Sequence, residues 1–193
     1  MDLVNRRAFL RAAAAAGAGW AIVDIAEVED ALAEAGHGMS APGPRTFRVL
    51  TAEQARVLDA FASRIIPSVD GRPGAHEAGA VHFIDQSLAT FNAGQKQLYA
   101  DGAFDLNRRA ARVRAAAPGF AALAPADQDA ILRAIEKTPF FAAARYDTIV
   151  GTFALPTWGG NRDYAGWRLL GFEHQPAFQA PFGYYDADAN RKI

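Results

Sequence analysis

The sequence predicts an all-α fold, and three observations support this class. Apolar residues recur at helical spacing, no stretch shows sustained period-2 alternation, and proline or glycine stands where each helical pattern ends. With 193 residues and a hydrophobic fraction of 51%, the chain is long and apolar enough to bury a core in one domain. We therefore expect a compact array of about five helices, followed by an irregular, aromatic-rich C-terminal tail.

The first helix of the folded part is expected to begin after Thr51. Thr51 and Gln54 have the spacing of a capping box, and Pro67 ends the apolar pattern that follows. A loop rich in glycine and proline then leads to a second helix. The apolar face of this second helix is expected to contain Val81, Ile84, Leu88 and Phe91.

Three further helices are expected downstream. One runs from about residue 94 to residue 117, with Tyr99, Leu106 and Val113 at heptad spacing. Pro125 suits the first position of a fourth helix, and a fifth is expected to start near Pro139. The apolar residues of the fourth helix include Ile131, Leu132 and Ile135. The fifth helix is expected to bury Phe141, Tyr146, Ile149, Val150 and Phe153.

Residues 1–35 have the pattern of a twin-arginine export signal. Arg6 and Arg7 precede Phe9 and Leu10, and an alanine-rich apolar stretch follows. That stretch is shorter than the roughly 20 residues of a membrane span. The alternative is an amphipathic first helix of a cytoplasmic protein.

The end of this segment is unusually acidic. Residues 31–33 and 33–35 are small-x-small candidates for signal cleavage, and the acidity leaves open whether cleavage occurs. Residues 36–46 are rich in glycine and proline and indicate a linker, so the folded domain is expected to cover residues 47–193. The acidic residues before the linker are Asp24, Glu27, Glu29, Asp30 and Glu34.

Residues 158–168 are the most distinctive part of the tail. Their paired glycines permit a positive φ or a close backbone approach, and they are rich in Trp, Tyr and Arg, which dominate binding hot spots. Two interpretations stay open together, a tight loop pinned to the helices and an interface with a partner protein. The residues expected at a partner interface are Trp158, Gly159, Gly160, Asn161, Tyr164, Trp167, Arg168, Tyr184 and Tyr185.

Several kinds of chemistry are excluded or disfavoured. The absence of cysteine excludes iron–sulfur clusters, covalent c-type haem and disulfides. A net charge of −1, with both signs mixed along the chain, gives no reason to expect nucleic-acid binding. His76 and His82 are six residues apart, which on one helix directs them to different sides.

No nucleophile motif or metal-binding motif appears in the sequence. We interpret Asp59, Asp85 and Asp101 as solvated helix residues. We therefore expect no catalytic, cofactor-binding or metal-binding residues in this chain.

A set of sequence blocks along the chain carries a family resemblance: residues 50–54, 62–67, 74–85, 123–128, 158–163 and 166–167. Together these blocks are similar to successive blocks of the gluconate 2-dehydrogenase subunit 3 family. Trp158 is a departure, because these proteins more often carry Tyr before the glycine pair.

The resemblance implies a small γ subunit without a redox cofactor. Its partner would be a flavoprotein of the glucose-methanol-choline type that carries FAD and oxidises a sugar or polyol. A third subunit can be a multihaem cytochrome c. The small subunit would take its signal-less partner through the twin-arginine translocase and help it mature, which places the complex in the periplasm at the inner membrane. The alternatives are a stand-alone periplasmic sugar-modifying enzyme and a small-ligand binding protein.

Overall fold

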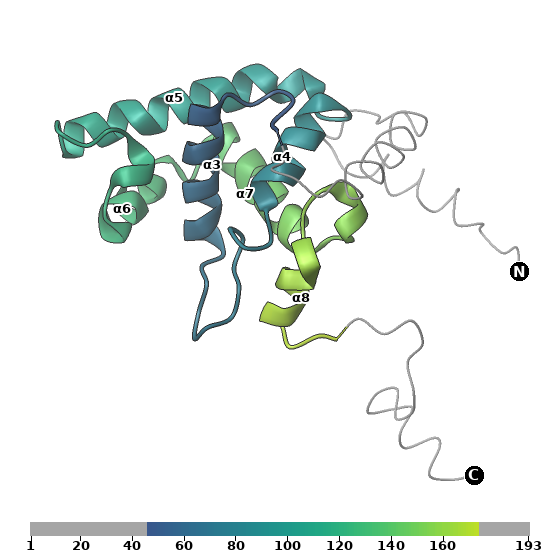
Figure 1. The fold of residues 1–193 in the computed structure, drawn as a ribbon. Helices are drawn as coiled ribbons and strands as arrows, with labels where there is room; N and C mark the ends of the chain where they lie inside the picture. The colour runs from purple at the N-terminus through teal and green to yellow at the C-terminus, as the bar shows by residue number, and fades with distance from the viewer. Residues whose placement is uncertain (1–45, 174–193) are drawn as a thin grey trace, which may run out of the picture.

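The computed structural model describes residues 46–173, and this part of the chain is helical with no strand. α5 runs along one edge of the molecule, with α6 and α8 on opposite sides (Figure 1). The all-α class is confirmed for the described residues, and the short α8 adds a helix where an irregular tail was expected. The helices are α3 (Ala52–Ile65), α4 (Ala80–Ala89), α5 (Lys96–Val113), α6 (Pro125–Ile135), α7 (Pro139–Phe153) and α8 (Ala165–Leu169).

The helix starts follow the capping residues in the sequence. Thr51 accepts from the Gln54 amide, and the Gln54 side chain accepts from the Thr51 amide, which completes the capping box before α3. Pro125 and Pro139 are the first residues of α6 and α7. The expected boundaries of the third helix were too wide. α5 follows a short 3-10 turn and ends before Arg114, whose backbone is extended.

The main core lies among α3, α5, α6, the first half of α7 and one face of α4. Tyr99 and Leu106 are buried in it. Val113 shares their heptad spacing but is exposed, because residues 111–116 are all exposed where α5 projects beyond α3 (Figure 1). The larger apolar members of the core are Leu50, Val57, Leu58, Phe61, Ile84, Leu88, Tyr99, Leu106, Phe120, Ile131, Leu132, Ile135 and Phe140.

The inward face of α7 was predicted wrongly. Tyr146 is exposed, and the other apolar residues expected there are only partly buried. The face that is buried is small and polar, because α4 approaches α7 closely. A Cβ added at Gly151 would lie 3.1 Å from the Ala80 Cα atom. The buried residues of α7 are Phe140, Ala144, Asp147, Thr148, Gly151 and Thr152.

Within residues 46–173, none of the helices combines the length and the apolar character that crossing a membrane requires.

Candidate functional site

Gly159 and Gly160, the glycine pair of the predicted interface segment, allow the loop after α7 to pack closely against that helix. Gly159 has a φ of 94°, in the left-handed region that favours glycine. Gly160 is buried, and a Cβ added there would lie 2.0 Å from the Gly151 carbonyl oxygen. One glycine therefore supplies the positive φ and the other the close backbone approach, the two roles that the sequence suggested.

Asn161 fixes the course of the chain after this pair. Its side chain is fully buried, and its backbone amide donates to the Gly151 carbonyl at 2.7 Å. Its Nδ2 donates to the Ala154 carbonyl at 2.8 Å, and its Oδ1 accepts from the Gly166 amide at 2.9 Å. Asn161 thus ties the end of α7 to the start of α8, and Gly160 and Asn161 shape the loop from within.

Three aromatic rings pack together after this loop, and the exposed Leu170 lies between two of them in the sequence. The Tyr164 and Trp167 rings stack at a centroid distance of 5.1 Å, and Phe172 meets Trp167 edge-on at 5.4 Å. The Trp167 Nε1 donates to the Phe153 carbonyl at 2.8 Å, which anchors the cluster to the end of α7. Exposed fractions are 40% for Tyr164, 66% for Leu170 and 42% for Phe172. We call these four residues the aromatic patch.

Two other predicted interface residues lie beside the patch. The Trp158 ring meets Phe91 edge-on at 6.3 Å and is partly buried. Arg168 is exposed and donates to the Asp163 carbonyl. Tyr184 and Tyr185 lie outside the described residues. So do the predicted export residues Arg6, Arg7, Phe9 and Leu10, and the assignment of a partner interface stays a prediction.

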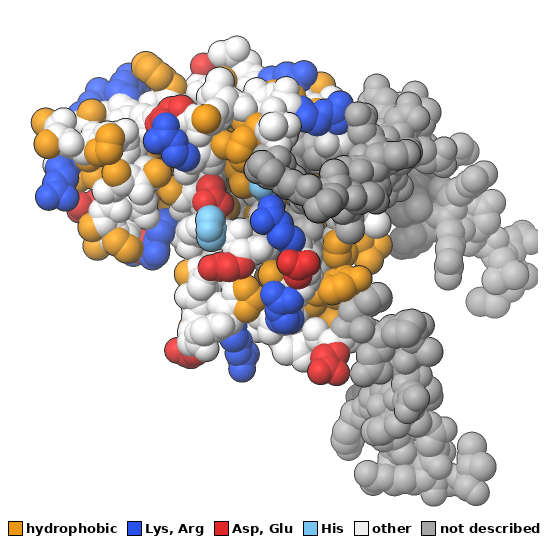
Figure 2. Space-filling view, viewed as in Figure 1, with side chains coloured by type: hydrophobic (Ala, Val, Ile, Leu, Met, Phe, Trp, Pro, Cys, Tyr) orange, Lys and Arg blue, Asp and Glu red, His pale blue; other side chains and the backbone are white. Residues whose placement is uncertain are grey.

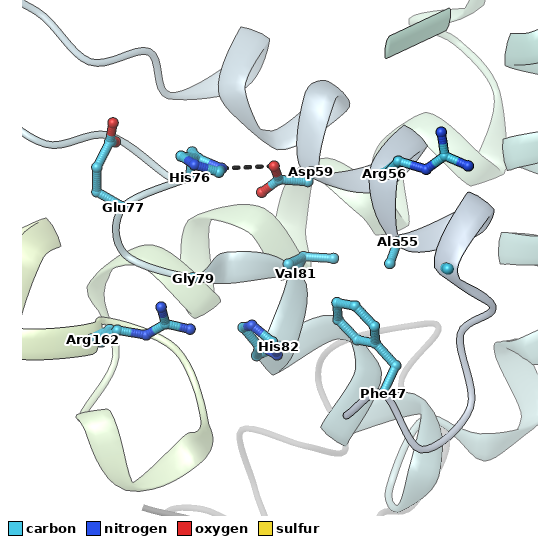
Figure 3. Close-up of a pocket in the computed structure, with 11 residues that line it drawn as sticks. Phe47, Ala55, Arg56, Asp59, His76, Glu77, Gly79, Val81, His82 and Arg162 are labelled. Atoms are coloured by element: carbon cyan, nitrogen blue, oxygen red, sulfur yellow. Dashed lines mark hydrogen bonds and ion pairs between the residues drawn. The ribbon is translucent and has the colours of Figure 1, made fainter. Parts of the chain in front are cut away.

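A groove of about 480 Å³ lies between α3, α4 and the loop that carries Arg162 (Figure 3). Its walls bring together three of the sequence blocks that carry the family resemblance, residues 50–54, 74–85 and 158–163. Blue, red and pale-blue side chains lie close together near the middle of the face seen in Figure 2, among orange and white atoms. The lining of the groove includes Phe47, Arg56, Asp59, His76, Glu77, His82 and Arg162.

Both histidines face this groove, although their spacing directed them to different sides of one helix. His76 lies in the turn before α4, so the helical spacing does not apply to it. Its Nδ1 lies 2.7 Å from the Asp59 Oδ2, and the His82 ring stacks on Phe47 at 4.9 Å (Figure 3). No group of three or more metal-ligating side chains exists among the described residues.

The carboxylates of the groove are occupied by local contacts. Asp59 holds His76, and Glu77 accepts from the Ser68 hydroxyl and the Gly74 amide, both at 2.7 Å. Partial burial raises the pKa of Glu77, but these hydrogen bonds outweigh it and leave the pKa below its ordinary value. Glu77 therefore stays ionised and fixes the turn before α4.

Asp85 is buried, so its interpretation as a solvated helix residue was wrong. Its carboxylate accepts from the backbone amides of Arg48, Val49 and Leu50 at 2.7–2.9 Å. A carboxylate that receives three amide donors is satisfied in the interior. Asp85 thereby fixes the entry of the chain beside α4 and holds Phe47 at the groove.

A second buried carboxylate escaped the sequence reasoning. Asp147 on α7 accepts from the Tyr99 hydroxyl of α5 at 2.6 Å, and the Ser87 hydroxyl of α4 lies 3.5 Å away. Burial raises the pKa of Asp147, and the hydrogen bonds oppose that rise only in part. Burial, and then the neighbouring Asp147, raise the pKa of the Tyr99 hydroxyl. The sequence did contain a signal for this pair, because Tyr99 lies among apolar residues of a helix and a buried tyrosine hydroxyl needs a hydrogen-bond partner.

The described site offers binding surfaces: a preformed aromatic patch and a charged groove. The fold around them is a small all-α domain. A model of the gluconate 2-dehydrogenase subunit 3 family matches residues 52–173, and the chain therefore belongs to this family. Neither the curated proteins nor the solved structures give a match.

Proposed function

We propose that this chain is a non-catalytic small subunit that escorts, matures and stabilises a flavin-dependent sugar or polyol dehydrogenase. The family name describes a subunit of a multi-subunit dehydrogenase, which supports a role beside a partner. In this proposal FAD and the oxidation chemistry belong to the partner, and a cytochrome c subunit passes the electrons on. The small subunit supplies the export signal and a docking surface.

The aromatic patch is the observation that carries the proposal. An exposed cluster of large apolar side chains is typical of a protein–protein contact, and Trp and Tyr are the residues that most often anchor one. Asn161 and the Trp167 Nε1 hydrogen bond hold the patch in place before any partner arrives. Such preorganisation lowers the entropic cost of binding.

Truncation of the patch should weaken assembly without unfolding the chain. Tyr164→Ala together with Leu170→Ala removes exposed apolar surface and leaves Asn161 and Trp167 in place. A hot-spot aromatic costs at least about 2 kcal/mol on truncation, so we expect a roughly thirtyfold loss of affinity for the flavoprotein. Co-purification and titration of the two subunits measure it, and circular dichroism checks the helix content.

Phe104→Ala is the matched control, because Phe104 is 71% exposed on α5, away from α8. It should leave assembly unchanged. Equal losses from both variants would contradict the patch as the docking surface. Flavin absorbance or sugar oxidation by the isolated chain would instead favour a stand-alone enzyme.

Export of the partner should depend on the paired arginines. Replacing Arg6 and Arg7 by Lys keeps the charge and removes the pattern that the twin-arginine translocase reads. We expect this chain and its flavoprotein to stay in the cytoplasm together, as fractionation and blotting of both subunits would show. Normal periplasmic recovery of the flavoprotein would contradict the escort role.

A further inference from the structure

The groove between α3 and α4 is lined by an arginine, Arg162, whose side chain has no ion-pair partner among the described residues. The Asp59 and Glu77 carboxylates are engaged by His76, Ser68 and the Gly74 amide. The Arg162 side chain is exposed and lies against Gly79 at the start of α4 (Figure 3). No hydrogen bond or ion pair joins its guanidinium to any residue within 46–173.

The groove is also partly apolar, and a second cation stands at its rim. Phe47 and Val81 contribute apolar wall, and Ala52 and Ala55 leave room between them. Arg56 lines the same groove and is strongly exposed, and within residues 46–173 its ion-pair partner is Glu53 on its own helix. An occupant that fits would combine several carboxylates with apolar side chains.

The chain enters its fold at the edge of this groove. Asp85 holds the amides of residues 48–50, and Phe47 is part of the groove wall. Whatever precedes residue 46 is therefore tethered at the rim. Residues 35–46 can span roughly 40 Å when extended, at about 3.3 Å per residue.

The segment before that linker has the complementary composition. Between Arg11 and Arg45 the sequence has no Lys or Arg. Five carboxylates fall within residues 24–34, interleaved with Ile25, Val28 and Leu32. The acidic, apolar stretch that is unusual for an export signal thus matches the apolar wall and the two arginines of the groove, whose own carboxylates, Asp59 and Glu77, are held by His76, Ser68 and the Gly74 amide.

We propose that residues 24–34 dock in this groove of the same molecule. The tether gives the acidic stretch an effective concentration on the order of millimolar, so contacts too weak to hold a free peptide are sufficient.

The absence of cysteine makes a trapping experiment clean in the full chain. A variant with Ala31→Cys in the acidic stretch and Ala52→Cys at the groove rim is oxidised with oxidised glutathione, and the rate of the intramolecular disulfide is measured. Ala31→Cys with Ala134→Cys is the control, because Ala134 is also an exposed helical alanine but lies on α6. We expect the groove pair to close at least about fivefold faster at low salt, where charge contacts are least screened.

Charge reversal separates docking from mere nearness of the tether. Arg56→Glu with Arg162→Glu should abolish the preference for the groove pair, and Lys at positions 27 and 29 in that background should restore it. Arg145→Glu, an exposed arginine of α7, should leave the preference unchanged. Circular dichroism confirms that each variant is folded. Equal rates for the two cysteine pairs, or a preference that survives reversal of both groove arginines, would overturn the proposal.

Discussion

The two halves of the described domain are held together by different means. Where α3, α5 and α6 meet, the interior is made of large apolar side chains such as Leu58, Leu106 and Ile131. Where α4, α7 and the loop before α8 meet, the interior is made of glycines, threonines and single polar atoms. There the Thr148 and Thr152 hydroxyls donate to the Ala144 and Thr148 carbonyls at 2.7 Å.

The difference affects how each half responds to change. An apolar core loses free energy roughly in proportion to the volume removed, and neighbours relax into part of the space. A contact between two backbones leaves no side chain that can move aside, and a buried amide without its partner costs the full desolvation of that group. The α4–α7 half, which positions the groove and the patch, should therefore be the more sensitive to small substitutions.

The largest effect is expected from Gly160→Ala. The new Cβ would lie 2.0 Å from the Gly151 carbonyl oxygen, so the loop must leave α7 and Asn161 must lose its partners. We expect a loss of at least about 3 kcal/mol in the free energy of unfolding, measured by urea denaturation.

Gly94→Ala is the matched control for this prediction. Nothing lies within 4 Å of a Cβ at Gly94, and its φ is not in the left-handed region. Its effect should stay within about 0.5 kcal/mol. Similar losses at the two glycines would show that the close approach at Gly160 is not what holds the loop.

A smaller loss is expected from Asp85→Ala. Three backbone amides would lose their acceptor, and the chain entry beside the groove would loosen. Hydrogen bonds to a charged group contribute about 1.5–3 kcal/mol, and we expect a loss of about 2–3 kcal/mol because water can reach part of the freed segment. Asp101→Ala on the exposed side of α5 should change stability by less than about 0.5 kcal/mol. Equal losses of stability from Asp85→Ala and Asp101→Ala would contradict this prediction, because Asp85 would then contribute no more than a solvated aspartate.

The apolar half was largely predictable from the sequence. The capping box at Thr51, the proline starts at Pro125 and Pro139, and the buried positions of α6 depend on contacts within a few residues or on helical periodicity. Such signals can be recognised in a single sequence because they do not depend on which element packs against the helix.

The polar half was not predictable in the same way. Asp85 and Asp147 are carboxylates on helices, and only the partners that tertiary packing brings, such as the Leu50 amide and the Tyr99 hydroxyl, make their burial favourable. The exposure of Tyr146 follows from the close approach of α4 to α7 at Gly151, a distance that periodicity does not encode. Blocks 50–54, 74–85 and 158–163 stood out in the sequence, but their convergence at the groove depends on tertiary packing.

The smallest expected effect is a pH dependence from Asp147. Its pKa is raised in the folded state, chiefly because burial disfavours the charged carboxylate. As the pH rises above the ordinary aspartate pKa of about 3.9, the unfolded chain releases its proton first, while the folded chain still holds its own. The unfolded state is then favoured, so the stability contributed by Asp147 is lost as the pH rises through the folded-state pKa.

Asp147→Asn should remove this dependence, because its amide does not titrate and its oxygen can still accept from Tyr99. The free energy of unfolding of the wild type, minus that of Asp147→Asn, should therefore fall as the pH rises from 4, and level off once the folded carboxylate is ionised. Denaturation curves over this range measure it. Tyr99→Phe removes the hydrogen bond that favours the charged form, so it should raise the pKa of Asp147 further and extend the fall to higher pH. If this difference instead grew with pH, folding would lower the pKa of Asp147, and the hydrogen bonds around the carboxylate would outweigh its burial. The ionised carboxylate would then stabilise the polar half.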